Sequence, residues 1–234
     1  MSFGYSENEL ILKNINTSFE KGKKYAIVGS SGSGKSSLLN LILKSNTTYQ
    51  GEIQFDSHEL RLIATECIYD IISYIQQNVF IFDDTIENNI KMYKDFEDSL
   101  VEEVIEQVGL SDLVSERGQA YHCGEGGSNL SGGEKQRLSI ARGLIRGSNI
   151  LLMDEGTAAL DNKIAYEIEK SVLDIEGLTC IVITHKMTAD LLNQYDKIIV
   201  LANKTIVEEG DFKTLMELNG IFSSFFNMSQ HEEP

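Results

Sequence analysis

The sequence predicts an α/β fold with a mostly parallel sheet, an antiparallel β part near the N-terminus and an inserted α-helical subdomain. Two observations support this prediction. Short apolar strand patterns alternate with helical patterns at both ends of the chain, as is typical of parallel sheets. Between residues 85 and 148, by contrast, only helical patterns occur.

Eight short apolar runs are predicted to be strands. They are Leu10–Ile15, Lys24–Val28, Glu52–Phe55, Ile71–Gln76, Ile150–Met153, Thr179–Ile183, Lys197–Leu201 and Thr205–Glu208. Helical spacing of apolar residues predicts the helices Lys35–Lys44, Thr85–Lys91, Phe96–Val108, Ser131–Ile145, Asn162–Leu173 and Met187–Gln194, with one or two more over Phe212–Asn227. The chain is therefore predicted to be a single domain. Its α/β core would comprise residues 1–77 and 149–234, and its helical subdomain residues 78–148.

Composition narrows the class of protein. Hydrophobic residues make up 41% of the 234 residues, which is enough for a substantial core. The net charge of −16 argues against nucleic acid as a partner, because that needs a basic surface. Three cysteines, Cys67, Cys123 and Cys180, lack the spacing of a disulfide framework or a zinc site, so a reducing compartment is expected. No apolar run approaches the roughly 18 residues of a membrane span.

The stretch GSSGSGKSS joins the predicted strand ending at Val28 to the helix beginning at Lys35. It matches G-x-x-x-x-G-K-[ST], the P-loop, so the core is predicted to be that of a P-loop NTPase. Lys35 would reach the β- and γ-phosphates, and Ser36 would hold Mg²⁺. The residues expected to contact the nucleotide are Gly29, Ser30, Ser31, Gly32, Ser33, Gly34, Lys35, Ser36 and Ser37. A flexible Gly/Ser linker is the alternative, but linkers do not lie between a buried strand and an apolar helix.

Two carboxylates follow the apolar strand that begins at Ile150. Asp154 and Glu155 lie at its carboxyl end, where α/β sheets bind ligands. Asp154 could orient Mg²⁺, directly or through water, and Glu155 could act as a general base on a water molecule. The alternative is a strand that simply ends in solvent. A P-loop in the same chain favours the functional interpretation.

The stretch LSGGE, Leu130–Glu134, opens a predicted helix with two glycines. Glycines near a helix start cost backbone entropy, so a reason for bare backbone is needed. With Ser131 as the N-cap, Gly132 and Gly133 would leave uncovered N–H groups at a helix N-terminus, an arrangement that binds anions.

The P-loop, LSGGE and the apolar strand with Asp154-Glu155, in this order, resemble the ATP-binding cassette (ABC) family, and the exporter-type nucleotide-binding domain in particular. The resemblance covers nearly the whole chain and implies ATP and Mg²⁺ as ligands. It implies catalytic roles for Glu155, His185, Gln77 and Lys35, with Ser36, Gln77 and Asp154 around the metal. Gln76, the neighbour of Gln77, is an alternative for the glutamine.

The resemblance also implies roles outside the phosphate site. Tyr5 would stack on adenine, unless it is merely an exposed tyrosine near the terminus. Asp161 would be the D-loop aspartate that reaches a second subunit. Glu125, in YHCGEGG, would contact a membrane domain, or belong to an ordinary glycine-rich loop. Two positions depart from the usual family pattern: Glu134 replaces a glutamine, and Ala158 replaces a serine whose hydroxyl could bond the D-loop.

The resemblance implies a homodimer that forms on ATP binding. Ser131, Gly132, Gly133 and Glu134 of one copy would complete the ATP held by the P-loop of the other. A transmembrane exporter domain, fused upstream, would contact Val79–Phe82 and Glu125 and place the chain at the cytoplasmic face of the membrane. Residues Phe80, Ile81 and Phe82 would form an exposed apolar patch, or pack inside. Two alternatives are a soluble ABC ATPase without a transport role and a nucleotide-binding regulator that does not hydrolyse ATP.

Overall fold

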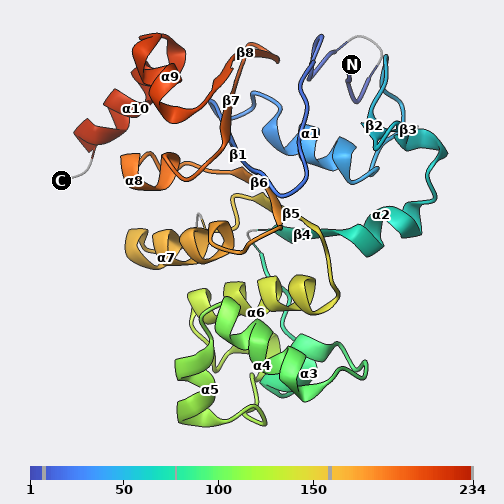
Figure 1. The fold of residues 1–234 in the computed structure, drawn as a ribbon, viewed down its shortest axis with the longest axis vertical. Helices are drawn as coiled ribbons and strands as arrows, with labels where there is room; N and C mark the ends of the chain where they lie inside the picture. The colour runs from blue at the N-terminus through green and yellow to red at the C-terminus, as the bar shows by residue number, and fades with distance from the viewer. Residues whose placement is uncertain (7–8, 77, 158–159, 233–234) are drawn as a thin grey trace.

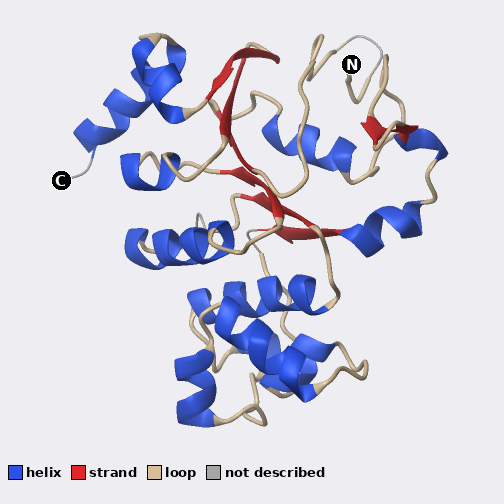
Figure 2. Ribbon diagram, in the orientation of Figure 1, coloured by secondary structure: helices blue, strands red, loops and turns tan. Residues whose placement is uncertain are grey.

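The computed structural model describes residues 1–6, 9–76, 78–157 and 160–232. Its centre is a six-stranded sheet in the order β4-β5-β6-β1-β7-β8 (Figures 1 and 2). The strands are β4 Ile72–Gln76, β5 Ile150–Asp154, β6 Thr179–Ile183, β1 Lys24–Val28, β7 Lys197–Ala202 and β8 Thr205–Gly210. All neighbouring pairs are parallel except β7 and β8. The predicted mostly parallel sheet is confirmed.

The sheet has a hydrophobic core on each face, because successive strand residues point to opposite sides. In β1, Ala26 and Val28 belong to one core, and Tyr25 and Ile27 belong to the other. Helix α1, Lys35–Ile42, packs on the Tyr25 side through its buried leucines. Helices α6, Gly132–Ile145, and α7, Asn162–Leu173, pack on the other side.

A group of helices lies at one end of the molecule, beyond β4 (Figure 1). It comprises α3 Ile86–Lys91, α4 Asp98–Gln107, α5 Ser111–Arg117 and α6. Thr85 caps α3, since its hydroxyl accepts a hydrogen bond from the Asn88 N–H at 3.0 Å. Buried Asn89 ties this group to the preceding loop, because its amide bonds to both backbone groups of Phe82 at 3.0 Å.

The N-terminal β part differs in detail from the prediction. The expected strand Leu10–Ile15 is absent: Leu12 makes one antiparallel bridge to Phe3, and the chain then continues as a loop. The expected strand Glu52–Phe55 is reduced to β2, Gln54–Phe55, which pairs in antiparallel fashion with β3, His58–Glu59. A helix that the sequence did not reveal, α2 Thr65–Ile71, follows and leads into β4.

The remaining helices are α8 Ala189–Leu192, α9 Phe212–Glu217 and α10 Ile221–Glu232, and two 3₁₀ turns cover Leu60–Leu62 and Glu125–Gly127. The carboxylate of Glu208 in β8 accepts hydrogen bonds from the Ile221 and Phe222 N–H groups at 2.6 and 2.9 Å, which fixes the start of α10. Within the described residues, no helix combines the length and apolarity needed to cross a bilayer.

Candidate functional site

The loop between β1 and α1 is shaped by glycines. Gly32 and Gly34 have φ angles of 75° and 104°, which L side chains rarely adopt. A Cβ on Gly29 would lie 2.1 Å from the Leu201 carbonyl oxygen, and one on Gly34 would lie 2.7 Å from Leu12 Cδ2. Only glycine fits at these two positions, so the backbone wraps tightly before α1 begins at Lys35.

Lys35 is folded back onto this loop. Its Nζ donates to the carbonyl oxygens of Gly29 and Ser30 at 2.9 and 3.1 Å. Burial lowers the pKa of Lys35, and the nearby carboxylates of Glu155 and Asp154 oppose that shift. A buried ammonium group held by neutral carbonyls is a good partner for an anion.

Ser33 adds an observation that favours a ligand in the loop. Its hydroxyl is buried, yet it has no hydrogen-bond partner among the described residues. Unpaired buried polar atoms are costly, so such an atom calls for a partner. A phosphate in the loop would supply acceptor oxygens for both Ser33 and Lys35. Ser30 and Ser31 are exposed at the loop tip, and Ser37 is partly buried one turn into α1.

Ser36 and Asp154 meet beside the loop. The Ser36 hydroxyl donates to Asp154 Oδ1 at 2.9 Å, and the Tyr74 hydroxyl donates to Asp154 Oδ2 at 3.0 Å. Burial, helped by the Asp154 charge, raises the pKa of Tyr74 to about 12, so Tyr74 stays a donor. A hydroxyl and a carboxylate are hard oxygen ligands that suit Mg²⁺.

The described residues contain no cluster of three or more His, Cys, Asp or Glu side chains that could hold a metal ion. Mg²⁺ is usually held by one or two protein oxygens together with phosphates and water, and the Ser36 hydroxyl and the Asp154 carboxylate are such oxygens. Gln77, the other expected metal contact, lies outside the described residues. Its neighbour Gln76 ends β4 and is in register with Asp154.

Glu155 and His185 lie together at the carboxyl ends of neighbouring strands. Strands β5 and β6 are parallel with Asp154 opposite Ile183, which brings the residues that follow them to the same edge. His185 Nε2 lies 2.9 Å from Glu155 Oε1, and both side chains remain partly exposed. Glu155 has a φ of 51°, an uncommon conformation for a residue other than glycine, and such strain is frequent at functional sites.

The N-terminus of α6 has the predicted cap and an additional constraint. The Ser131 hydroxyl accepts from the Glu134 N–H at 3.3 Å, and the Glu134 carboxylate accepts from the Ser131 N–H at 2.6 Å. This capping box leaves the N–H groups of Gly132 and Gly133 without an acceptor in the described part of the chain. Glu134, which departs from the family pattern, therefore has a structural role.

Packing also explains the two glycines. A Cβ on Gly133 would lie 2.7 Å from Ile164 Cγ2 of α7, and one on Gly132 would lie 2.8 Å from Leu160 Cδ2. The predicted role of these glycines, to leave backbone N–H groups uncovered, is thus accompanied by a second one in packing. Close packing of α6 against α7 thus favours glycine at position 133, whereas at position 132 a shift of the flexible Leu160 side chain would make room for a larger residue.

Asp161 caps α7, since its Oδ1 accepts a hydrogen bond from the Ile164 N–H at 3.0 Å. Its side chain is exposed, and so it is available to a second molecule. Ala158, the other departure from the family pattern, lies outside the described residues. Asp161 therefore has a local structural role that does not depend on a partner.

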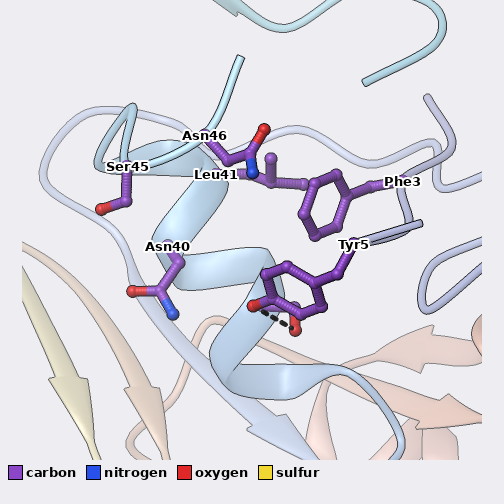
Figure 3. A pocket seen from close by; sticks show the side chains of 7 residues that line it. Phe3, Tyr5, Asn40, Leu41, Ser45 and Asn46 are labelled. Carbon is purple, nitrogen blue, oxygen red and sulfur yellow. Dashed lines mark hydrogen bonds between the residues drawn. The ribbon is translucent and has the colours of Figure 1, made fainter. Parts of the chain in front are cut away.

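Tyr5 lies over the flank of α1 (Figure 3). Tyr5 is 67% exposed, and its ring makes an edge contact with Phe3 at a centroid distance of 5.0 Å. The Tyr5 and Ser37 hydroxyl oxygens are 3.4 Å apart. A cavity of about 250 Å³ lies here, lined by Phe3, Tyr5, Ser37, Asn40, Leu41, Ser45 and Asn46. The ring face is accessible to a flat aromatic ligand.

The expected patch at Phe80, Ile81 and Phe82 is only partly exposed. Phe80 is 69% exposed and Phe82 is partly buried, but Ile81 is 1% exposed and belongs to the core. The expectation of a patch formed by all three side chains was therefore wrong for Ile81. Glu125 is exposed in its 3₁₀ turn.

Two residues that contact the site were not predicted from the sequence. Tyr74 bonds Asp154, and buried Gln136 of α6 donates to the Gln76 carbonyl oxygen at 3.4 Å. Neither residue belongs to a contiguous motif. Their placement depends on strand register and on helix packing, which leave no local signal.

Comparisons with known proteins find the same family in a sequence profile, in relatives and in a solved structure. The sequence profile of the family described as ABC transporter matches residues 12–158. The chain is 38% identical to the glutathione/L-cysteine transport system ATP-binding/permease protein CydC of Haemophilus influenzae, over 95% of this chain and 39% of that protein. It is 32% identical to the ATP-dependent lipid A-core flippase of Saccharophagus degradans, over 96% of this chain and 39% of that protein.

A solved structure is also similar to this chain in fold. The structure of a bacterial Atm1-family ABC exporter with ATP bound matches with a TM-score of 0.87 and 28% identity, over 97% of this chain and 41% of that one. The chain thus spans about two fifths of the length of the relatives it matches.

Proposed function

Because the chain belongs to the ABC transporter family, we propose that it binds and hydrolyses ATP and thereby powers export through a membrane domain. One observation carries this proposal. The chain presents two backbone sites for phosphate, the P-loop before α1 and the N-terminus of α6, on helices that pack against opposite faces of the sheet. Residues 1–77 and 149–234 are the catalytic core in this proposal, and residues 78–148 carry the second phosphate site.

ATP binding uses the P-loop and its surroundings. The adenine ring stacks on Tyr5, whose ring face is exposed. The phosphates lie in the loop, where Lys35 and the unpaired Ser33 hydroxyl provide donors. Ser36 and Asp154, with the expected help of Gln77, would hold Mg²⁺, which would supply positive charge against the phosphates.

Hydrolysis uses the pair at the carboxyl ends of β5 and β6. The Glu155 carboxylate polarises a water molecule for in-line attack on the γ-phosphorus, in the manner of a general base. His185 lies within hydrogen-bonding distance of Glu155. From there the histidine contacts the γ-phosphate and stabilises the developing charge, together with Lys35.

A second copy completes each site. The N–H groups of Gly132 and Gly133 have no acceptor in the described part of the chain, and they add the partial positive charge of a helix N-terminus. In a head-to-tail homodimer they contact the γ-phosphate held by the partner. ATP then joins the two copies, and its hydrolysis separates them.

The relatives named above are called an ATP-binding/permease protein, a flippase and an exporter. We infer that a membrane domain contacts this chain at exposed Phe80 and Glu125, at the cytoplasmic face of the membrane. Opening and closing of the ATP-bound dimer would move that domain.

Glu155→Gln tests the hydrolytic step. The amide cannot act as a base, so the variant is expected to bind ATP without turnover and to accumulate as a dimer on size exclusion with MgATP. The double variant Glu155→Gln/Lys35→Ala is the control, because it cannot hold ATP and should stay monomeric. A Glu155→Gln chain that remains monomeric while saturated with ATP would contradict the shared site. A wild-type chain without ATPase activity at high concentration would favour a regulator.

A mixing experiment tests the sharing directly. Lys35→Ala removes the P-loop cation, and Gly132→Asp places a carboxylate where the partner's phosphate would lie, while acidic residues are tolerated in a first helical turn. Each variant alone should be inactive. In a mixed dimer, one P-loop and one signature remain intact in the same site, so an equal mixture should regain about a quarter of the wild-type rate by statistics.

Gly132→Asn is the matched control for charge, since asparagine has the size of aspartate without its charge. It should be less impaired than Gly132→Asp. A mixture of the Lys35→Ala and Gly132→Asp variants that stays inactive, although both chains are folded, would refute the shared site.

A further inference from the structure

Buried polar side chains form hydrogen bonds with the segment that carries His185. It leaves β6 at Ile183 and runs to the start of α8. Thr184 is buried, whereas His185 is exposed and contacts Glu155. Because the exposed histidine ring has little packing around it, its position depends on what fixes the backbone of this segment.

Glu169 in the middle of α7 lies behind that segment. Glu169 is only 1% exposed to solvent, and such complete burial is rare for a glutamate. Tyr195 donates a hydrogen bond to Oε1, and Thr184 Oγ1 donates to Oε2 at 3.2 Å. Burial raises the pKa of Glu169 to about 7, and the two hydroxyl donors and the nearby Lys186 charge oppose that shift.

The Thr184 hydroxyl extends this contact to the other side of His185. It accepts a hydrogen bond from the Lys186 N–H at 3.0 Å while it donates to Glu169. Because one hydroxyl has one proton to donate, the ionised carboxylate, the form that prevails above about pH 7, fixes its direction and leaves its lone pairs for the Lys186 N–H. His185 thus lies between Thr184, whose side chain bonds Glu169 of α7, and Lys186, whose N–H bonds the Thr184 hydroxyl.

Two further contacts hold the same segment. Lys186 Nζ donates to Asn162 Oδ1 at the start of α7, at 2.5 Å, and Gln230 Nε2 of α10 donates to the Met187 carbonyl oxygen at 2.7 Å. Both lie on the C-terminal side of His185. On its N-terminal side, the Thr184 N–H donates to the Ile27 carbonyl oxygen at 3.4 Å, and Glu169 provides the buried contact to the Thr184 side chain.

We propose that Glu169 is a positioning residue: through Thr184 it fixes the backbone on both sides of His185 and so holds the imidazole ring beside Glu155. This inference rests on the proposed ATPase function. Glu169 itself does not touch the nucleotide. Its effect on hydrolysis passes entirely through His185.

The competing explanation is that Glu169 serves stability alone, and Tyr195 separates the two. Tyr195→Phe removes a donor from the same buried carboxylate but leaves the Thr184 contact intact. Thr184→Val keeps the shape of the side chain and removes that contact. Glu169→Met removes the carboxylate, and Glu169→Gln retains an oxygen that can accept from Thr184 and an amide that can donate to Tyr195.

Steady-state ATPase kinetics of the 234-residue chain provide the first test. Thr184→Val and Glu169→Met are expected to lower kcat about tenfold or more with little change in KM for ATP, because small misplacements of a catalytic group can cost about 100-fold. Tyr195→Phe and Glu169→Gln should keep kcat within about threefold of wild type, the cost of a weakened hydrogen bond. Equal losses of kcat in Tyr195→Phe and Thr184→Val would refute the proposal.

A His185→Ala background tests whether the effect passes through the histidine. There, Thr184→Val should cause no further loss of kcat, since the group it positions is gone. A multiplied loss would refute the proposal. Circular dichroism at the assay temperature selects folded variants, and Glu169→Gln keeps the test usable if Glu169→Met does not fold.

Two spectroscopic readouts do not depend on ATPase activity. Thr184→Val should speed hydrogen exchange of the Lys186 amide and shift the ring signals of His185, one of four histidines in the chain, whereas Tyr195→Phe should leave both nearly unchanged. If the wild-type chain proves inactive, the proposed function fails and these signals still decide the positioning. If the chain is active but neither signal responds to Thr184→Val, the positioning role fails alone.

Discussion

Replacing Glu169 by glutamine should make the protein more stable than wild type at pH 8 and change its stability little near pH 4.5. The reason is the burial of the Glu169 carboxyl group. In the unfolded chain this group has its ordinary pKa of 4.5, and in the folded chain burial raises the pKa to about 7. A raised pKa favours the folded state while the group is protonated, and that stability is lost as the pH rises through the folded pKa.

The size of the effect follows from the shift. Each pKa unit corresponds to about 1.4 kcal/mol, so the rise from 4.5 to about 7 costs wild type about 3 kcal/mol between those two pH values. Glutamine does not ionise, so it escapes this cost. For a protein of this size, about 3 kcal/mol corresponds to roughly 6–12 °C in Tm.

The assay is urea unfolding followed by circular dichroism at several pH values from 4.5 to 8. Circular dichroism is suitable because the chain has no tryptophan for fluorescence. Glu176→Gln is the control, because it removes the same charge at an exposed position after α7. The difference between Glu169→Gln and wild type should grow with pH, and that for the control should stay small. A difference that is constant from pH 4.5 to 8 would refute the account of a buried carboxyl group.

The structure makes three further predictions. Lys35→Ala should abolish binding of a fluorescent ATP analogue at micromolar concentrations while circular dichroism is unchanged, and undiminished binding would remove the phosphate-site assignment. Gly133→Ala should cost about 1–3 kcal/mol of unfolding free energy, because the new methyl group would collide with Ile164; Gly210→Ala, where the contacts are ordinary, is its control in the same urea titration. Asn89→Ala should cost about 1–2 kcal/mol, since it leaves the partly buried backbone groups of Phe82 unpaired, and a thermal unfolding curve that matches wild type would contradict this.

The parts of the fold that the sequence predicts well have strong local signals. Helix α7 has the predicted bounds, Asn162–Leu173, because a capping aspartate precedes a regular apolar stripe. Helices α2 and α5 were missed because each buries a single side chain, Ile68 and Leu113, and one apolar residue creates no periodicity. The run Leu10–Ile15 is apolar, but it has only a single bridging partner on the adjacent segment and so forms no strand.

The residues of the candidate site likewise include some with a local sequence signal and some without one. Residues in contiguous motifs, such as Lys35 and Glu155, could be named as candidates from the sequence because they have a fixed spacing along the chain. Tyr74, Gln136 and Glu169 could not be identified. They reach their partners across strand pairs or between a helix and a loop, and that proximity exists only after folding.

Helix α7 connects several residues of the candidate site. Asp161 begins it, its Ile164 lies against Gly133 of α6, and its Glu169 bonds the segment before His185. Its 12 residues form a stiff rod about 18 Å long. Any force that tilts this rod therefore displaces Asp161, Gly133 and His185 at the same time, so the proposed contact with a second copy and the proposed hydrolysis of ATP would depend on the same helix.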